Sequence, residues 1–432
     1  MTTLEQTGGT VADQLATLVA GVAGGALPVR LRAWDGSEAG PATGPTLVVR
    51  DRMALRRLLW RPNELGLAQA YIAGELDVEG DLADGLRQVW RHARDRHLAG
   101  GGVRMGTADR LRALRTAARL GVLGPRPAAP DAQAKLGGRL HTKERDRAAI
   151  SYHYDLSNDF YQLLLDPQLA YSCAYWTSAA PDHDLAAAQY DKLELICRKL
   201  ALRPGMRMLD VGCGWGSLTI HAARHHGVHV TGVTLSAQQR DFATARIAEL
   251  GLADRAEIRL QDYRDVADGP YDAIATVEMG EHVGDGQYPV FAAGLHDLLG
   301  PQGRLLVQQM SRGHHAPGGG AFIESYVAPD MHMRPVGETV ALLEAAGLEV
   351  RDVHAMREHY VRTVAAWLDT LEERWDAVVD LVGEPVARVW RLYLVGGALT
   401  FEEGRMGVDQ ILAVRRTADG VSGVPLSGEE WR

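Results

Sequence analysis

Three glycines that follow a short apolar run form the part of this chain best suited to hold a small molecule. Met208–Val211 has the composition of a buried strand, Gly212, Gly214 and Gly216 come next, and a helical pattern begins near Ser217. Glycine in such a turn lets the backbone approach a ligand closely, because no Cβ stands in the way. The following helix then directs its first N–H groups at the ligand. The pattern predicts a binding turn, and other residues must decide what it binds.

The residues after the next two predicted strands distinguish two possible ligands. A nicotinamide dinucleotide is usually held by an acidic residue at the end of the second strand, and Val233–Gln239 contains none. The spacing Gly-x-Gly-x-Gly is also tighter than the dinucleotide fingerprint. After the third strand, Asp262 could accept a hydrogen bond from an adenine amino group, and Tyr263 could line the ring. These residues favour S-adenosylmethionine over NAD.

Alternating strands and helices must position these residues. Periodicity predicts strands at 206–211, 228–234, 256–261, 271–277 and 304–308, and helices at 185–200, 218–226 and 238–251. Strict alternation predicts an α/β fold with a doubly wound, mostly parallel sheet whose ligand lies at the carboxyl ends of the strands. Further on we expect a helix at 336–347 and strands at 348–354 and 407–415. The aromatic-rich helical stretch between these last two strands would form a lid.

The length of 432 residues predicts two or three domains. A strand at 46–50 and helices at 51–60 and 67–74 indicate a small α/β module near the N-terminus. We therefore assign residues 1–96 to an accessory module, residues 97–148 to a basic linker with an amphipathic helix, and residues 149–432 to the domain that contains the glycine turn.

Charge is distributed unevenly along the chain. The formal net charge of −9 argues against a general nucleic-acid binder, but residues 87–147 contain 15 Lys and Arg against 5 Asp and Glu. Within that stretch, Asp109–Leu120 places Leu111, Leu114 and Ala118 at helical spacing among arginines. Such a helix can lie on anionic lipid headgroups, or it can be a solvated tether between two domains. Composition leaves both interpretations open.

Cysteine content and hydropathy indicate the cellular compartment of the protein. Cys173, Cys197 and Cys213 are too few and too scattered for a disulfide framework or a zinc site, so we expect no metal. No stretch has the pattern of a signal peptide or of a membrane-spanning helix. We expect a cytoplasmic protein.

Six motifs that occur in one order identify a family. They are Tyr152–Asp159, Ala170–Trp176, Leu209–Gly216, Gly232–Ser236, Gln261–Asp265 and Glu281–Gly284. Together they resemble the cyclopropane-fatty-acyl-phospholipid synthase family, which includes the mycolic acid methyltransferases. The resemblance covers residues 140–416 and implies a class I S-adenosylmethionine-dependent methyltransferase fold, Rossmann-like, with a helical lid insertion. The N-terminal module, with Ala70–Gly74, resembles more loosely the lipid-associating domain of the bacterial synthases. This resemblance implies a peripheral position on the inner face of the membrane.

The resemblance implies one-carbon transfer from S-adenosylmethionine to the double bond of an unsaturated fatty acyl chain of a phospholipid. The π electrons of the alkene attack the sulfonium methyl group, which leaves a carbocation, and in the family a bound bicarbonate ion then removes a proton. Because an alkene is a poor nucleophile, alignment and a dry pocket must supply most of the rate. Aromatic faces can stabilise the cation, and Tyr171, Tyr175, Trp176 and the lid tryptophans are candidates.

The resemblance also implies the site residues. The bicarbonate pocket of the family corresponds to Glu281, Tyr360, Cys173, the backbone of Met310, and Gln308. Many members have a histidine at the last position, and a glutamine there can donate a hydrogen bond to an anion but cannot relay protons. Bicarbonate could therefore bind while its role as the base is in question. The implied cofactor contacts are Tyr154, Tyr171, Ser172, Gly212, Gly214, Trp215, Thr234, Leu235, Gln239, Asp262 and Tyr263.

Two products and several rival functions stay open. Direct loss of a proton from the cation gives a cyclopropane ring, whereas a preceding hydride shift gives a chain with a 10-methylene type branch. Gln308 and the Arg- and Ala-rich composition resemble actinobacterial members that make such branches, and a separate reductase would then complete a methyl branch. The rivals are a methyltransferase acting on a small soluble substrate, a non-catalytic lipid-binding protein and a nicotinamide oxidoreductase. We expect a homodimer and no nucleic-acid partner.

Overall fold

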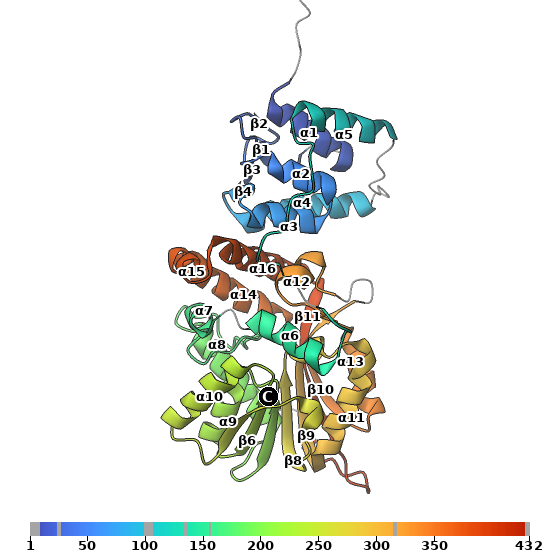
Figure 1. Ribbon diagram of the computed structural model, residues 1–432. Coiled ribbons are helices and arrows are strands. Elements are labelled where there is room, and N and C mark those ends of the chain that lie inside the picture. The colour runs from blue at the N-terminus through green and yellow to red at the C-terminus, as the bar shows by residue number, and fades with distance from the viewer. Residues whose placement is uncertain are drawn as a thin grey trace, which may run out of the picture. The chain divides into compact units, whose positions relative to one another are not determined.

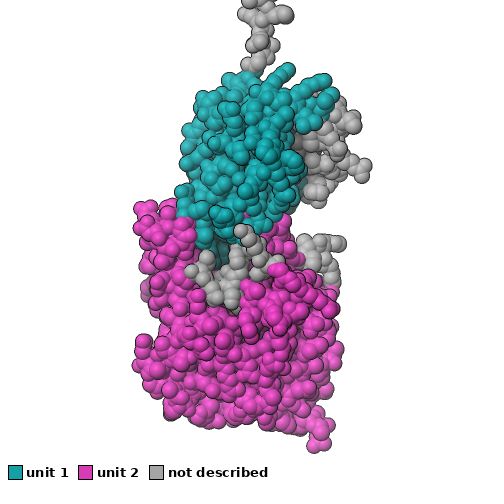
Figure 2. Space-filling view, viewed as in Figure 1, with its two compact units in different colours: residues 1–133, 384–399 teal, residues 134–383, 400–432 magenta. Residues whose placement is uncertain are grey.

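The computed structural model describes residues 9–23, 27–98, 107–133, 137–154, 157–313 and 318–427. The chain divides into two compact units, which Figure 2 colours separately. Unit 1 contains residues 1–133 and 384–399, and unit 2 contains residues 134–383 and 400–432. These boundaries differ from the expected ones at residues 96 and 148, because residues 107–133 pack into unit 1 and do not form a linker. Most of α16 (Glu384–Glu402) also belongs to unit 1.

Unit 1 is a small α/β module, as expected. Its four-stranded sheet has the order β2-β1-β3-β4, in which β1 and β3 are parallel and the other pairs are antiparallel. The strands are β1 (Arg30–Arg32), β2 (Glu38–Ala39), β3 (Thr46–Val49) and β4 (Leu76–Glu79). The helices are α1 (Val11–Ala23), α2 (Met53–Trp60), α3 (Glu64–Ile72), α4 (Leu82–Leu98) and α5 (Thr107–Arg119).

The basic helix α5 packs on unit 1 through a face that the sequence pattern did not indicate. Ala117 and Leu120 are buried and join Leu15 of α1 in the hydrophobic core. Leu111 and Leu114, which we expected to form the apolar stripe, are 49% and 53% exposed. Leu111 and Leu114 therefore face solvent. Ala117, near the end of α5, and Leu120, directly after it, make the contact with the hydrophobic core instead.

Unit 2 is built on a seven-stranded sheet of order β10-β11-β9-β8-β5-β6-β7, and the expected fold class is confirmed (Figure 1). Its strands are β5 (Arg207–Val211), β6 (His229–Thr234), β7 (Ala256–Leu260), β8 (Tyr271–Val277), β9 (Leu299–Arg312), β10 (Glu349–Ala355) and β11 (Met406–Val414). The strands from β7 to β9 are parallel, whereas β11 is antiparallel to both β9 and β10. This order places the carboxyl ends of β8, β5 and β6 side by side.

Apolar side chains of unit 2 alternate between the two faces of the sheet. On β5, Met208 belongs to the core beneath α8, α9 and α10, whereas Leu209 and Val211 belong to the core beneath α11 and α13. The parallel strands are therefore buried on both faces, as their near-continuous apolar runs predict. The helices are α6 (Lys143–Tyr154), α7 (Asn158–Leu164), α8 (Leu185–Lys199), α9 (Ser217–His226), α10 (Ala237–Glu249), α11 (Tyr288–Leu298), α12 (Ala321–Tyr326) and α13 (Val336–Ala345), with 3-10 turns η1 (Tyr263–Asp265), η2 (Gly280–His282) and η3 (Asp285–Gln287).

A helical insertion separates the last two strands, as expected. It consists of α14 (Arg357–Glu373), α15 (Trp375–Val382) and α16. The buried residues of α14 include Tyr360, Thr363, Val364 and Trp367, whose spacing of three, four and seven defines one helix face. That face packs on β11 and α7, and it brings Tyr360 to the carboxyl edge of the sheet. Within the described residues, none of the helices combines the length and the hydropathy that a bilayer crossing needs.

Candidate active site

The glycine turn after β5 forms one wall of a cavity at the carboxyl edge of the sheet in unit 2. Gly212 has φ +79°, and a Cβ there would lie 2.8 Å from Cγ of Met279. Gly214 has φ +54°, and a Cβ there would project into open space. The turn is fixed to β6 because the backbone N–H groups of Gly212 and Cys213 both donate to the carbonyl oxygen of Val233, at 3.0 Å. Conformation requires glycine at both positions, and close packing adds to the requirement at Gly212.

Ten of the eleven expected cofactor residues line this one cavity, which encloses about 1130 Å³ including its open mouth. They are Tyr171, Ser172, Gly212, Gly214, Trp215, Thr234, Leu235, Gln239, Asp262 and Tyr263. The eleventh, Tyr154, is the last residue of α6, and its side chain lies outside the part of the chain that the structure describes. Residues that are far apart in sequence therefore share one enclosure.

Asp262, at the end of β7, is held ionised by an arginine. Its two carboxylate oxygens accept hydrogen bonds from Nε and Nη2 of Arg264, at 2.8 and 2.6 Å. Burial would raise the pKa of Asp262, but these hydrogen bonds and the charge of Arg264 hold it below its ordinary value. Nη2 of Arg264 also donates to Asp146 of α6, at 2.9 Å. A carboxylate can accept about four hydrogen bonds, so Asp262 can still accept one from a ligand.

A row of aromatic rings runs from the cavity to α14, and two of its members, Trp215 and Tyr171, line the cavity. Trp215 is 2% exposed, its Nε1 donates to Oδ1 of Asn158 at 2.9 Å, and its ring lies 4.4 Å from that of Tyr161. Tyr161 contacts Tyr171 at 5.7 Å, and Tyr171 in turn contacts Trp367 at 5.2 Å between ring centroids. Tyr171 therefore connects the cavity, which it lines, to Trp367 of α14.

Trp176 and Tyr175, two of the aromatic residues expected to stabilise the cation, contact other side chains of the protein. The guanidinium carbon of Arg362 lies 4.2 Å from the ring centroid of Trp176, so that a permanent cation already covers this face. The ring of Tyr175 packs against His354 and His359. Among the lid tryptophans, Trp367 is buried behind Tyr171, and Trp390 belongs to unit 1. Tyr171 therefore keeps the best position of the candidates.

The residues expected to hold bicarbonate instead surround a carboxylate of the chain itself, Glu278. Oε1 of Glu278 accepts hydrogen bonds from the backbone N–H of Cys173 at 2.7 Å and from Nε2 of Gln308 at 3.0 Å. Oε2 accepts one from the hydroxyl of Tyr360 at 2.6 Å. Glu278 also lines the cavity, so its side chain is only partly buried. Three of the expected pocket residues therefore donate to a side chain that we had not singled out, whereas the backbone N–H of Met310 donates to Glu281. Binding of bicarbonate by these residues stays a prediction.

Glu281 lies beside this group in a different environment. It is 1% exposed, and Oε1 accepts a hydrogen bond from the backbone N–H of Met310 at 2.5 Å. Oε2 has no hydrogen-bond partner among the described residues. Burial, followed by the charge of Glu278, raises the pKa of Glu281 to about 8. Glu281 is therefore protonated at neutral pH.

The cysteine and the glutamine of the site act through hydrogen bonds. Burial raises the pKa of the Cys173 thiol well above its ordinary value, so that it stays neutral and donates to the carbonyl oxygens of Ala174 and Met356. Gln308 is fully buried, and its Oε1 accepts a hydrogen bond from Gln410 of β11 at 3.0 Å. That contact fixes the orientation of the amide, and Nε2 is therefore directed at Glu278.

A buried lysine supplies a positive charge that acts on Glu278. Nζ of Lys192, on α8, donates to Oγ of Ser172 at 2.8 Å, and the residue is 1% exposed. Burial lowers the pKa of Lys192, while the charges of Glu278, Asp166 and Asp210 raise it. Burial likewise raises the pKa of Asp210, at the end of β5, to about 6.

Sequence reasoning did not find Glu278 or Lys192. Glu278 follows β8 directly, and an acidic residue at the carboxyl end of a central strand is a signal that could have indicated it. Lys192 lies within a helix whose polar and apolar residues give no such signal. Neither residue belongs to the motif segments on which the predictions rested.

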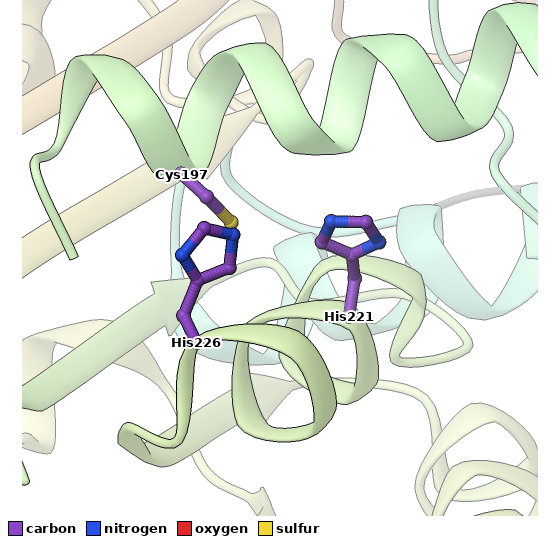
Figure 3. A group of neighbouring side chains, drawn as sticks. All are labelled: Cys197, His221 and His226. Atoms are coloured by element: carbon purple, nitrogen blue, oxygen red, sulfur yellow. The ribbon is translucent and has the colours of Figure 1, made fainter. Parts of the chain in front are cut away.

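A second group of side chains, away from the cavity lining, has the residue types of a metal site (Figure 3). One ligand atom each from Cys197 of α8 and His221 and His226 of α9 lies within 4.8 Å of the others. Oε2 of Glu194 already pairs with Nε2 of His221 at 3.2 Å and of His226 at 3.1 Å. Burial lowers the pKa of His221 to about 4, so its ring is neutral. These contacts join α8 to α9, and the expectation of no metal stays a prediction.

The comparisons with known proteins agree with the geometry. The family model for mycolic acid cyclopropane synthetase matches residues 141–411. A probable fatty acid methyltransferase of Pseudomonas putida is 36% identical over 413 residues, which cover 94% of this chain and 96% of that protein. The tuberculostearic acid methyltransferase UfaA1 of Mycobacterium tuberculosis is 33% identical, with 90% and 88% covered.

A solved structure is also similar. The crystal structure of mycolic acid cyclopropane synthase CmaA1 complexed with SAH and CTAB has a TM-score of 0.58 and 31% identity, and the match covers 62% of this chain and 97% of that one. The family that the six motifs indicated is thereby confirmed. The chain belongs to the mycolic acid cyclopropane synthetase family of lipid-modifying, S-adenosylmethionine-dependent methyltransferases.

Proposed function

We propose that this protein transfers the methyl group of S-adenosylmethionine to the double bond of an unsaturated fatty acyl chain in a phospholipid, with a methylene-branched chain as product. One observation carries the proposal. A single cavity in unit 2 is lined both by the glycine turn at Gly212 and Gly214 and by the hydrogen-bonded carboxylate of Glu278. A methyl donor and a proton acceptor can therefore act on one substrate inside one enclosure.

The cavity residues fit S-adenosylmethionine. No Cβ projects from Gly214, so the backbone can lie against the methionine part of the molecule. The ionised Asp262 can accept a hydrogen bond from the adenine amino group, and the ring of Tyr263, held edge-on against Phe291 at 5.1 Å, can pack on the base. Thr234 and Gln239, which hydrogen-bond each other at 2.8 Å, lie between these two regions at the end of β6 and the start of α10. The bound cofactor supplies an electrophilic methyl group.

An apolar acyl substrate fits the remaining wall better than a polar one. Trp215 and Tyr171 present aromatic rings to the cavity, and the face of such a ring can stabilise a cation. A soluble, polar substrate would need several converging polar groups on that wall. The alkyl surfactant CTAB in the CmaA1 complex and the fatty acid methyltransferase relatives support an acyl chain as substrate. These features disfavour the rival activity on a small soluble molecule.

The branched product is favoured over the ring because Gln308 stands where many members of the family have a histidine, and an amide cannot relay protons. A hydride shift must precede proton loss, so the cation must persist for longer than in ring closure. The similarity to the tuberculostearic acid methyltransferase UfaA1 supports this choice, whereas the similarity to CmaA1 supports the ring as the second candidate. A methylene branch becomes a methyl branch only by reduction, so we propose a separate reductase as the next enzyme.

Unit 1 carries exposed features that suit a membrane surface. Leu111 and Leu114 of α5 are exposed next to the exposed Arg115 and Arg119. Trp60, at the end of α2, is 56% exposed, and its Nε1 donates to the carbonyl oxygen of Gly124 at 3.0 Å. Apolar side chains among arginines can insert between anionic headgroups. We therefore propose that the protein works in the cytoplasm as a peripheral protein on the inner membrane face, and that it forms a homodimer.

Vesicle sedimentation tests this surface. We expect binding to anionic phospholipid vesicles that weakens as salt rises, and we expect L114S combined with R115E to reduce it about tenfold. The matched control is L250S, which changes an exposed leucine of unit 2. Equal binding by the wild type and the double variant would reject the proposed surface, and sedimentation velocity without lipid gives the oligomeric state.

Expression in a bacterial host whose lipids contain oleoyl chains tests the activity. We expect fatty acids that have gained one CH₂ group, with the exocyclic methylene protons visible by NMR. Cyclopropane protons would support the second candidate, and unchanged lipids would contradict the proposed function. Calorimetric titration with S-adenosylmethionine and with NAD separates the methyltransferase from the nicotinamide and non-catalytic alternatives.

A further inference from the structure

A side chain of this protein occupies the place where the family resemblance implies a free anion. The backbone N–H of Cys173, the amide of Gln308 and the hydroxyl of Tyr360 all donate to the carboxylate of Glu278, at 2.7, 3.0 and 2.6 Å. Three donors from three distant segments make this the most densely hydrogen-bonded carboxylate that lines the cavity wall beside β8 and β9. A bicarbonate ion would have to displace Glu278 to reach the same donors.

We propose that Glu278 is itself the base that removes the proton from the carbocation, so that catalysis needs no bound bicarbonate. This inference rests on the proposed function. Its geometric basis is that Glu278 lines the cavity and accepts hydrogen bonds from three donors within the described part of the chain. A carboxylate has about four acceptor sites, and the contacts to Cys173, Gln308 and Tyr360 use three of them.

The two neighbouring carboxyl groups differ in protonation. Burial raises the pKa of both Glu278 and Glu281, and Glu281 is moved to about 8 with the charge of Glu278 as a second cause. Glu278 is partly stabilised in its ionised form by its three donors and by the charge of Lys192, whereas one oxygen of Glu281 lacks any partner among the described residues. These contacts favour the negative charge of the pair on Glu278 over Glu281. A carboxylate with raised proton affinity is the better base.

The backbone at Glu278 supports a role in the reaction. Its φ of +51° lies in the left-handed region, which a residue with a side chain rarely adopts. Its N–H donates to the carbonyl oxygen of Gln308, which fixes this conformation against β9. Glycine would adopt it without strain, so a glutamate here costs stability, as strained residues at functional sites often do. The strain places the carboxylate at the cavity wall.

The reaction begins at the double bond of the acyl chain. The alkene forms a C–C bond to the methyl carbon as the C–S bond breaks, and the electron pair of that bond stays on sulfur. After the hydride shift, a C–H bond next to the cationic carbon breaks and its electron pair forms the new C=C bond. The proton passes to the carboxylate of Glu278, and it returns to water after the product leaves. In ring closure the same electron pair would form a C–C bond instead.

Turnover on oleoyl phospholipid vesicles, measured with and without bicarbonate, tests this assignment. Activity of the wild type establishes the proposed function first, and its absence would count against that function and not against Glu278. We expect the wild type to lose no activity in CO₂-depleted buffer, and E278Q to lose at least about 100-fold in kcat. The matched control, E344Q, removes an exposed carboxyl of α13 and should match the wild type.

The variant E278G keeps the test decisive. Glycine relieves the positive φ and leaves the donors of Cys173, Gln308 and Tyr360 facing an empty site, so added bicarbonate or formate should restore activity at least about tenfold. Calorimetric titration with S-adenosylmethionine confirms that each variant is folded. Wild-type activity that depends on added bicarbonate, or E278Q activity within about threefold of the wild type, would overturn the proposal.

Discussion

The two ends of the cavity in unit 2 are built from different parts of the protein. Beside β5 and β6, the wall is largely backbone, from the glycine turn at Gly212 and Gly214. Beside β8 and β9, the wall is a group of side chains, in which Cys173, Gln308 and Tyr360 converge on Glu278 from separate segments. Binding at the glycine turn depends on the conformation of the backbone. The hydrogen bonding of Glu278 depends on each of the side chains that surround it. Changes at the first end should therefore weaken cofactor binding, and changes at the second end should slow turnover.

The largest effect on turnover outside Glu278 should come from Y360F. The hydroxyl of Tyr360 donates to Oε2 of Glu278 at 2.6 Å, and a hydrogen bond to a charged group contributes about 1.5–3 kcal/mol. We expect kcat to fall about 10- to 100-fold while the dissociation constant of S-adenosylmethionine stays within about twofold. Y190F, at a 42% exposed tyrosine of α8, is the control. Steady-state kinetics in which Y360F lowers the affinity for S-adenosylmethionine but leaves kcat unchanged would contradict the role of this end of the cavity in turnover.

Replacement of Gly212 or Gly214 by alanine should lower the affinity for S-adenosylmethionine and leave kcat nearly unchanged. G212A places a Cβ 2.8 Å from Met279 and also demands a positive φ, whereas G214A demands only the positive φ. A left-handed residue other than glycine costs about 1–2 kcal/mol. We expect affinity for S-adenosylmethionine to fall about tenfold in G212A and less in G214A, with kcat at saturation nearly unchanged. Calorimetric titration measures both, and equal affinities would show that the turn does not contact the cofactor.

A smaller effect is expected at the adenine end. D262N keeps the shape of Asp262 but removes the charge that pairs with Arg264, which can still pair with Asp146. We expect affinity for S-adenosylmethionine to fall only about fivefold, because the amide oxygen of asparagine can still accept the hydrogen bond from adenine and only the contribution of the charge is lost. If D262N binds the cofactor as tightly as the wild type, another residue recognises the adenine.

Glu281 predicts how stability depends on pH. Its pKa in the folded protein is about 8, well above its ordinary value of 4.5, because of burial and the neighbouring Glu278, with Arg334 acting in the opposite direction. The folded state therefore binds more protons than the unfolded state between these values. The free energy of unfolding should fall as pH rises from about 5 to about 8, by roughly 3–5 kcal/mol.

E281Q should flatten that dependence. The amide carries no charge at either end of the pH range, and its oxygen can still accept the hydrogen bond from Met310. Urea unfolding of the wild type and of E281Q at several pH values measures the effect. Parallel curves for the two proteins would mean that Glu281 does not titrate in this range.

The smallest effect is expected from chelation. Glu194 already pairs with His221 and His226, and neither these residues nor Cys197 line the cavity. Treatment with EDTA should leave both kcat and the melting temperature unchanged. Loss of either, with recovery on adding zinc, would show that the group in Figure 3 binds a metal.

The sequence predicted the sheet of unit 2 closely because its strands are regular and apolar. The strand expected at 271–277 is β8 itself, and the glycine turn follows β5 as expected. β9 is longer than expected because its polar residues Gln309 and Ser311 pair with β11, a partner about 100 residues away. The face of α5 was missed for the same reason, since its partner α1 lies far from it in sequence.

The cofactor half of the site was more predictable than the base half. Gly212, Gly214 and Asp262 follow strands directly, so their positions are set by local pattern and by the rule that ligands bind at carboxyl strand ends. The surroundings of Glu278 depend on contacts from Cys173 and Tyr360, which lie 105 and 82 residues away. Only the tertiary structure brings these donors together, so the spacing of residues within one motif cannot predict the surroundings of Glu278.

Incubation of the purified protein with oleoyl phospholipid vesicles and methyl-labelled S-adenosylmethionine tests the central claim most directly. We predict that the label appears in the acyl chain as an exocyclic methylene group, identified by NMR of the released fatty acid. Unlabelled lipid, in the presence of protein that binds S-adenosylmethionine, would contradict the proposed function.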